Sequence, residues 1–147
     1  MHAQAVSLLK PDDVNAIGNL PPIAICGFIQ DEGGERRFVP NRPFIDFMHR
    51  AIAAFAEHDP GIAAAARQQG DGYLYIIDQR TPDGPSGSVP PEDIVGAHRV
   101  AQGRIVPGGY EANPHHLLVS ANGLVRLPPA MEAFLVAEIR KAAGNGP

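Results

Sequence analysis

The chain has 147 residues, of which 44% are hydrophobic, and a formal net charge of −4. A chain of this length buries enough apolar surface to fold without a metal or a disulfide, and its composition excludes a disordered protein. The 12 basic residues are scattered rather than gathered in a patch, which argues against nucleic acid as a partner. We therefore expect a single globular domain over residues 1–147.

Cysteine content and hydropathy favour the cytoplasm. The one cysteine, Cys26, lies in an apolar run and is expected to be a small buried side chain without a nucleophilic role. One cysteine cannot form a disulfide within the chain, which fits a reducing compartment. The N-terminus lacks the pattern of a signal peptide, and no apolar run reaches the roughly 18 residues of a membrane span. The sequence predicts a cytoplasmic protein with no membrane partner.

The first part of the chain predicts a weakly ordered segment followed by a hairpin. Residues 1–20 show little pattern, although Pro11 can open a short helix that Gly18 would end. The apolar residues 23–29 and the segment 36–39 are separated by turn residues, which predicts a β-hairpin.

Two helices are predicted next. The first begins near Pro43, and its large apolar residues recur at helical spacing, which is typical of a helix with one face in the core. This stripe consists of Phe44, Phe47, Met48, Ala51, Ile52 and Phe55. The second helix is expected to begin at Asp59, a good N-cap, and Pro60, and to end at Gly70. Its alanines allow close packing on a neighbouring element.

The strongest strand signal lies at residues 73–77, an apolar run rich in aromatic and β-branched residues. Turn residues flank this run, which predicts a strand buried on both faces. Four prolines and two glycines make residues 81–91 a loop. Further strands are expected at residues 94–100 and 104–106, joined by a tight turn that contains a glycine.

The remaining segments predict a short strand at residues 116–120, a turn at Asn122 and Gly123, a helix over residues 130–143 and a frayed tail at residues 144–147. The apolar stripe of this helix consists of Met131, Phe134, Leu135 and Ile139. Because turns rather than helices connect the clustered strands, the expected fold class is α+β. We expect one mainly antiparallel sheet of about five strands, covered on one side by two to three helices.

No motif fixes a reaction. The glycines lack the strand–loop–helix spacing of a phosphate-binding loop, and no serine has the context of a nucleophile elbow. The residues that could serve as acid–base or metal-ligating groups are His98, His115, His116, Asp78 and Asp93. Adjacent strand residues point to opposite faces, so only one of His115 and His116 could face such a site. The spacing matches no metal motif, so we expect no metal and no cofactor.

A binding surface is expected at one end of the sheet. The hairpin formed by residues 94–106 returns the chain to the end at which the preceding loop enters, so the irregular segments 78–91 and 110–116 would share that end. Loops on rigid strands are frequent binding surfaces, and Tyr and Arg are frequent binding anchors at exposed positions. The candidate binding residues are Asp78, Arg80, Arg99, Tyr110, Asn113 and His115.

The run GYLYIID at residues 72–78, the VPP turn at residues 89–91 and the run IVGA at residues 94–97 resemble the small actinobacterial proteins associated with type VII secretion. Those proteins show an aromatic strand ending in Asp, a proline-rich turn, a VVGA-like strand and an Asn-containing segment ahead of a tyrosine. Here Asn113 holds the Asn position, whereas His116 stands where the tyrosine would be. The resemblance covers residues 72–116 and implies an accessory or binding protein without catalytic residues.

Together these patterns predict a small non-enzymatic interaction domain, an accessory or immunity-type protein of a bacterial secretion system, that binds a protein partner. The alternative is a small hydrolase or metal-dependent enzyme that uses His98 and either His115 or His116 with Asp78 or Asp93. The sequence identifies neither the partner nor the oligomeric state, and leaves a homodimer open.

Overall fold

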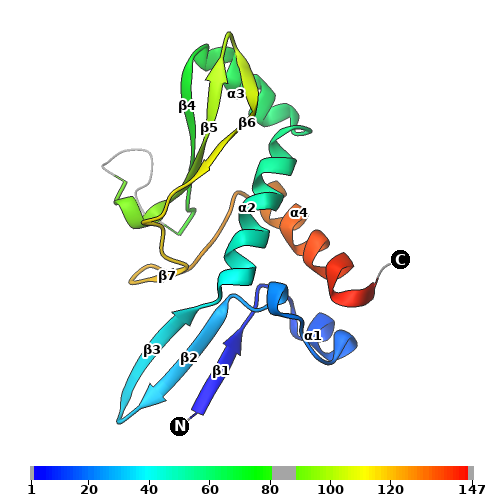
Figure 1. The fold of residues 1–147 in the computed structure, drawn as a ribbon, viewed down its shortest axis with the longest axis vertical. Helices are drawn as coiled ribbons and strands as arrows, with labels where there is room; N and C mark the ends of the chain where they lie inside the picture. The colour runs from blue at the N-terminus through cyan, green and yellow to red at the C-terminus, as the bar shows by residue number, and fades with distance from the viewer. Residues whose placement is uncertain (1, 81–88, 146–147) are drawn as a thin grey trace. The chain divides into compact units, whose positions relative to one another are not determined.

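The computed structural model describes residues 2–80 and 89–145 (Figure 1). Its strands are β1 (His2–Val6), β2 (Gly27–Glu32), β3 (Glu35–Pro40), β4 (Gly72–Ile77), β5 (Ile94–Ala101), β6 (Arg104–Ala112), β7 (Val119–Ser120) and β8 (Gly123–Leu124). Its α-helices are α1 (Pro11–Ile17), α2 (Arg42–Ala56), α3 (Pro60–Gln69) and α4 (Pro129–Arg140). Short helical turns lie at η1 (Pro22–Ala24), η3 (Pro91–Asp93) and η4 (Lys141–Asn145).

The described residues form an α+β fold with three small antiparallel sheets, ordered β1-β2-β3, β4-β5-β6 and β7-β8. The α+β class and the antiparallel pairing are confirmed. The expected single sheet of about five strands is wrong, because the N-terminal hairpin pairs with β1 instead of with the central strands. β1 lies in the segment whose weak pattern gave no strand signal.

The chain forms two compact units, Met1–Ala51 with Ala133–Pro147, and Ile52–Glu132. The boundaries fall inside the residue ranges of α2 and α4, so each of these helices contributes residues to both units. The single domain expected from the sequence stays a prediction. Among the described residues, no helix combines the length and the apolar character needed to cross a membrane.

In the first unit, the predicted hairpin is confirmed as β2 and β3, which turn at Gly33 and Gly34. The strand starts later than expected, at Gly27, because Pro21 precedes η1 and Pro22 begins it, and this turn takes up residues 22–24. The Asn41 side chain donates hydrogen bonds to two carbonyl oxygens around this turn, both at 2.9 Å. Cys26 is fully buried, as expected, and burial raises the pKa of its thiol to about 12.

The helices follow the sequence closely. α1 begins at Pro11 and ends before Gly18, and α3 begins after Asp59, whose carboxylate accepts a hydrogen bond from the Ile62 N–H at 3.0 Å. The predicted apolar stripes are buried at Phe44, Met48, Ala51 and Ile52 in α2, and at Met131, Leu135 and Ile139 in α4. The remaining large members, Phe47, Phe55 and Phe134, are half-buried.

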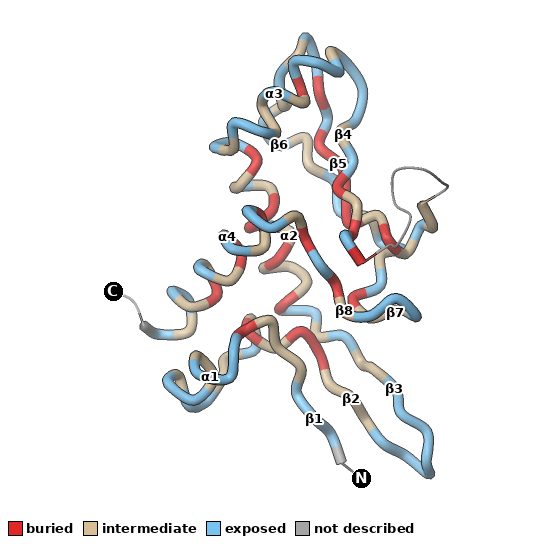
Figure 2. The backbone as a smooth tube through the Cα atoms, turned by 180° about the vertical axis from the view of Figure 1, so that it is seen from behind, coloured by how far each residue is buried: buried red, intermediate tan, exposed pale blue. Residues whose placement is uncertain are grey.

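In the second unit, β5 lies between β4 and β6. The tight turn between β5 and β6 has positive φ at Gln102 (51°) and Gly103 (75°), which is the geometry that suits a two-residue hairpin. The sequence predicted that this strand ends before Pro107, but β6 continues to Ala112. The pairing with β5 shifts register at the Pro-Gly-Gly segment. β4 and β6 are the two edge strands of this sheet (Figures 1 and 2).

Candidate functional site

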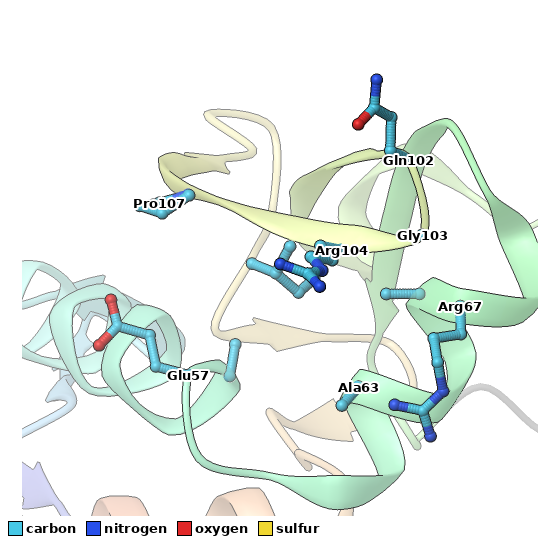
Figure 3. Close-up of a pocket in the computed structure, with 10 residues that line it drawn as sticks. Glu57, Ala63, Arg67, Gln102, Gly103, Arg104 and Pro107 are labelled. Atoms are coloured by element: carbon cyan, nitrogen blue, oxygen red, sulfur yellow. The ribbon is translucent and has the colours of Figure 1, made fainter.

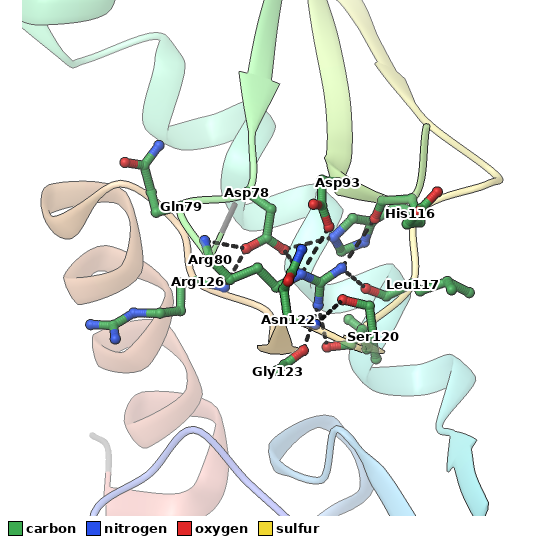
Figure 4. Close-up of polar contacts among 12 residues, drawn as sticks. Asp78, Gln79, Arg80, Asp93, His116, Leu117, Ser120, Asn122, Gly123 and Arg126 are labelled. Atoms are coloured by element: carbon green, nitrogen blue, oxygen red, sulfur yellow. Dashed lines mark hydrogen bonds and ion pairs between the residues drawn. The ribbon is translucent and has the colours of Figure 1, made fainter. Parts of the chain in front are cut away.

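Polar residues that the sequence singled out meet where β4 ends. Asp78 follows β4, Arg80 comes two residues later, Asp93 ends η3 and His116 follows β6 (Figure 4). We call these four residues the Arg80 clasp. The carboxylates and the arginine are buried, and the side chains of Arg80 and His116 are only 1% and 3% exposed.

Arg80 uses every N–H donor of its guanidinium, which carries five. The Nε donates to a carboxylate, and the two terminal nitrogens each donate to two backbone carbonyls from three different segments. The acceptors are Asp93 Oδ1 (3.0 Å), the carbonyls of Leu118 (3.0 Å) and Gly123 (2.9 Å) at Nη1, and those of Glu92 (3.1 Å) and Leu117 (2.6 Å) at Nη2. No donor is left to hold a ligand.

Asp78 is the second centre of the clasp. Its Oδ1 accepts the backbone N–H groups of Arg80 (3.2 Å) and Arg126 (2.9 Å), and its Oδ2 lies 3.0 Å from Nε2 of His116. The Asp78 N–H in turn donates to the carbonyl of Asp93 at 2.7 Å. These bonds tie the end of β4 to η3, to the segment after β6 and to the segment after β8.

The contact between His116 and Asp78 is the arrangement by which a carboxylate orients a catalytic base. Here it is closed to substrates, because the two side chains are 3% and 0% exposed. A hollow of about 400 Å³ is lined by Arg80 of the clasp together with Gln79, Asn122 and Arg126 among others, but neither His116 nor Asp78 is among the described residues that line it. We read the clasp as a structural centre.

The other two candidate histidines, His98 and His115, take no part in the hydrogen bonds of the clasp. His98, on β5, is buried with its ring 4.9 Å from that of Tyr110, and its Nε2 has no hydrogen-bond partner among the described residues. Burial lowers the pKa of His98. His115 is exposed. Over residues 2–80 and 89–145, no three His, Cys, Asp or Glu side chains gather in a way that could hold a metal ion.

The expected meeting of two irregular segments at one end of the sheet is confirmed for their described parts. The Asn113 side chain donates to the carbonyls of Pro91 and Ile94, both at 2.8 Å, and His116 reaches Asp78. Residues 81–88 of the expected recognition loop lie outside the described residues. Asn113, which the sequence analysis proposed as a binding residue, therefore uses its side-chain amide to hold these two segments together.

Tyr110 packs rather than projects. It is half-buried beneath β5, where a Cβ on Gly96 would overlap its hydroxyl and the carbonyl of Glu111, and burial raises its pKa. The expectation of solvent-facing positions is also wrong for Asp78 and Arg80, because carbonyls far along the chain take up the guanidinium. Of the six candidate binding residues, Arg99 and His115 are exposed.

The expectation that the strand at residues 73–77 is buried on both faces is wrong, and a surface on this strand was therefore missed. Tyr73 and Tyr75, exposed at 42% and 59%, are two of the three large hydrophobic residues that are exposed in the described part of the chain. Their ring centroids are 6.4 Å apart, and the register pairs Tyr73 with Arg99 of β5. We call these three residues the tyrosine face. The signal was present, because tyrosines alternate with the aliphatic Leu74 and Ile76, a period-two pattern of a half-exposed strand.

The backbone of β4 is also open on this side. The Asp78 N–H donates to the carbonyl of Asp93, the residue just before β5, so the alternating residues Tyr73, Tyr75 and Ile77 turn their N–H and C=O groups away from β5. Two of those carbonyls are occupied by glutamine side chains, Tyr73 by Gln69 (2.6 Å) and Ile77 by Gln79 (3.1 Å). The strand itself carries no charge and no proline from Gly72 to Ile77, two of the usual protections of an edge, although its ladder with β5 has a register shift between Ile76 and Ile77.

The opposite edge of the same sheet is protected. β6 carries Pro107, the glycines that follow it, a register shift and the charged Glu111.

Comparisons with known proteins add no assignment: no protein-family model, no curated protein and no solved structure matches this chain.

Proposed function

We propose that the protein is a non-enzymatic interaction module that binds an extended peptide segment of a partner protein along β4. The observation that carries this proposal is the exposure of Tyr73 and Tyr75 on one side of an edge strand that carries no charge and no proline. An edge strand pairs with an added strand through its outward backbone groups, while pockets between alternate side chains give selectivity. Tyr and Arg are the residues most often found as anchors of such interfaces.

The size of the surface favours a peptide over a folded partner. β4 has six residues, which corresponds to a strip of about 20 Å, one strand wide. A stable interface between two folded proteins buries roughly 800 Å² on each side, more than such a strip offers. A single extended segment fits the strip, and an acidic residue in that segment would lie opposite Arg99.

The closed state of the Arg80 clasp supports a binding role rather than catalysis by the histidines and carboxylates that the sequence grouped. The resemblance to type VII secretion-associated proteins points the same way, since it implies an accessory protein. We extend the proposal accordingly to a cytoplasmic accessory protein of a bacterial secretion system.

Selection from a display library of random peptides of about ten residues tests the proposal. Peptides selected on the wild-type protein should bind a variant carrying Tyr73→Thr and Tyr75→Thr at least about 10-fold more weakly, because two anchor rings are lost. Threonine keeps the β-propensity of the strand. The matched control is Leu117→Thr, which removes the other exposed large hydrophobic side chain of the described residues.

Equal loss of binding in the Leu117→Thr control would place the peptide elsewhere and contradict the proposal. So would self-association of the protein through β4, measured by analytical ultracentrifugation and abolished by the double substitution, since the occupant would then be a second copy of the chain.

A further inference from the structure

A cavity of about 550 Å³ lies in the second unit between α3, the residues at the end of α2 and the start of β6 (Figure 3). Its volume is in the range of pockets that bind small molecules, about 300–1,000 Å³. All of its lining residues come from the one unit, and the tyrosine face and the Arg80 clasp contribute none of them. The cavity is therefore separate from both sites described above.

Small apolar side chains make the space. Ala56, Ala63 and Ala66 line it from the helices, and Ile105 lines it from β6. The alanine-rich sequence of α3 leaves a gap where larger side chains would fill the groove between helix and strand. The same helix reaches the β5–β6 turn closely, since a Cβ on Gly103 would lie 3.4 Å from the Cα of Arg67. The floor of the cavity is thus apolar, and at one end α3 lies against the β5–β6 turn.

The charged groups around this cavity are mainly cationic. Arg67 and Arg104 both line it and are both exposed, and neither side chain has a hydrogen bond or ion pair in the described part of the chain. Glu57 lies on the far side, and no ion pair joins it to either arginine (Figure 3). Gln102 points away from the other lining residues in the same view. Two unpaired guanidinium groups beside an apolar cavity are suited to an anion.

We propose that this cavity binds a small organic anion, a carboxylate with an apolar body. The apolar body would lie against the alanines and Ile105, and the carboxylate would meet Arg104, with Arg67 as the second cation. A guanidinium pairs with a carboxylate through two parallel hydrogen bonds, which gives arginine an advantage over lysine at such a site.

Titration with three probes of one chain length, followed by amide shifts in heteronuclear NMR spectra, tests the proposal. Octanoate should bind with a dissociation constant of about 1 mM or below, the range expected for a ligand of about ten heavy atoms. Its shifts should cluster on α3 and the first half of β6. Octanol should bind at least about 10-fold more weakly, and octylamine should not bind at all, because the arginines repel it.

Two variants locate the site. Arg104→Gln should weaken octanoate at least about 10-fold and leave octanol unchanged. Ala63→Leu should weaken both, because it fills the apolar floor, and its spectrum shows directly whether the fold is kept. Arg126→Gln, another exposed arginine of the same unit, is the matched control and should change nothing.

Equal affinity for octanoate and octanol, or octanoate shifts that persist in Arg104→Gln at wild-type affinity, would overturn the assignment of an anion. The absence of saturable shifts with all three probes would overturn the site itself.

Discussion

One strand carries two surfaces of opposite character. Where β4 ends, the Arg80 clasp gathers an arginine, two carboxylates and a histidine, and buries them with every guanidinium donor used. Along β4 itself, the tyrosine face leaves two tyrosine side chains exposed, beside outward backbone groups of which two carbonyls are occupied by glutamine side chains. Arginine, carboxylates and histidine are more typical of catalytic sites than two tyrosines are.

The difference teaches that unsatisfied groups, rather than clusters of reactive residue types, point to function. A buried polar network whose donors and acceptors are all paired has nothing left to offer a ligand, and its role is to hold distant segments in one arrangement. Exposed apolar area and unpaired edge groups still have an interaction to gain. The following predictions break or sharpen this contrast, from the largest expected effect to the smallest.

The largest effect is expected at the clasp. Arg80→Met leaves Asp78 and Asp93 as buried carboxylates without their cation and deprives four backbone carbonyls of a donor. Removal of one partner from a buried ion pair typically lowers the free energy of unfolding by about 3–5 kcal/mol. Urea denaturation should show a loss of this size, which is a large part of the total stability of a typical domain.

The matched control is Arg99→Met on the tyrosine face, where the same substitution removes an exposed guanidinium. It should change the free energy of unfolding by no more than about 0.5 kcal/mol. Similar losses for the two variants would mean that the clasp is solvated in solution, and the contrast between the two surfaces would fail.

The sheet should also tolerate substitution less well where Gly96 packs against Tyr110 than at an exposed position. Gly96→Ala places a methyl group against the Tyr110 hydroxyl and the Glu111 carbonyl, so overpacking should cost about 1–3 kcal/mol in thermal or urea unfolding. Glu111→Ala, at an exposed position of β6, should stay within about 0.5 kcal/mol. A neutral Gly96→Ala would show that Tyr110 moves freely and is available to bind, as the sequence first suggested.

Because His98 is buried, the free energy of unfolding should depend on pH. Its pKa in the folded protein lies below the usual 6.5, and the neighbouring Tyr110 hydroxyl, with a raised pKa, stays neutral. Above pH 6.5 the imidazole is neutral in both states. As the pH falls below 6.5, the unfolded chain takes up the proton first, so stability should decrease until the pH reaches the folded pKa.

Urea unfolding at about pH 7.5 and about pH 5.5 measures this loss. His98→Phe keeps a ring beside Tyr110 and should reduce the difference between the two pH values. His115→Gln, at an exposed histidine, should leave the difference as it is in the wild type. The same pH dependence in His98→Phe as in the wild type would show that other groups cause it.

The smallest effect on stability is expected on the tyrosine face, where substitutions should have the largest effect on binding. Tyr73→Thr and Tyr75→Thr should each change the free energy of unfolding by no more than about 0.5 kcal/mol, because both side chains are exposed and threonine suits a strand. A loss near 2 kcal/mol from either one would show that its ring is buried in solution, and would remove it as a binding anchor.

Local patterns predicted much of the fold. The stripe in α2, the Asp59 cap of α3, the turn at Gln102 and Gly103, and the antiparallel α+β class all follow from short-range spacing and backbone preferences. The division into three sheets did not follow, because the pairing of β1 with β2 joins segments about 25 residues apart and leaves no local trace.

The candidate site was predicted in place but not in role. The return of the chain after β6 correctly brought the segment at Asn113 and His116 to the end of the sheet where Asp78 lies. The burial of Arg80 could not be predicted, because its acceptors at Leu117, Leu118 and Gly123 are backbone carbonyls, which every residue type has. The tyrosine face could have been found from the alternation along β4.

Hydrogen exchange at the amide of Tyr75 tests the central claim most directly. Its N–H points away from β5, whereas those of Leu74 and Ile76 lie in the ladder and serve as internal references. In the free protein the Tyr75 amide should exchange much faster than its two neighbours, and a selected peptide should slow it to their range, because the peptide backbone accepts its hydrogen bond. If the Tyr75 amide exchanges as fast with the peptide bound as in the free protein, the account is contradicted.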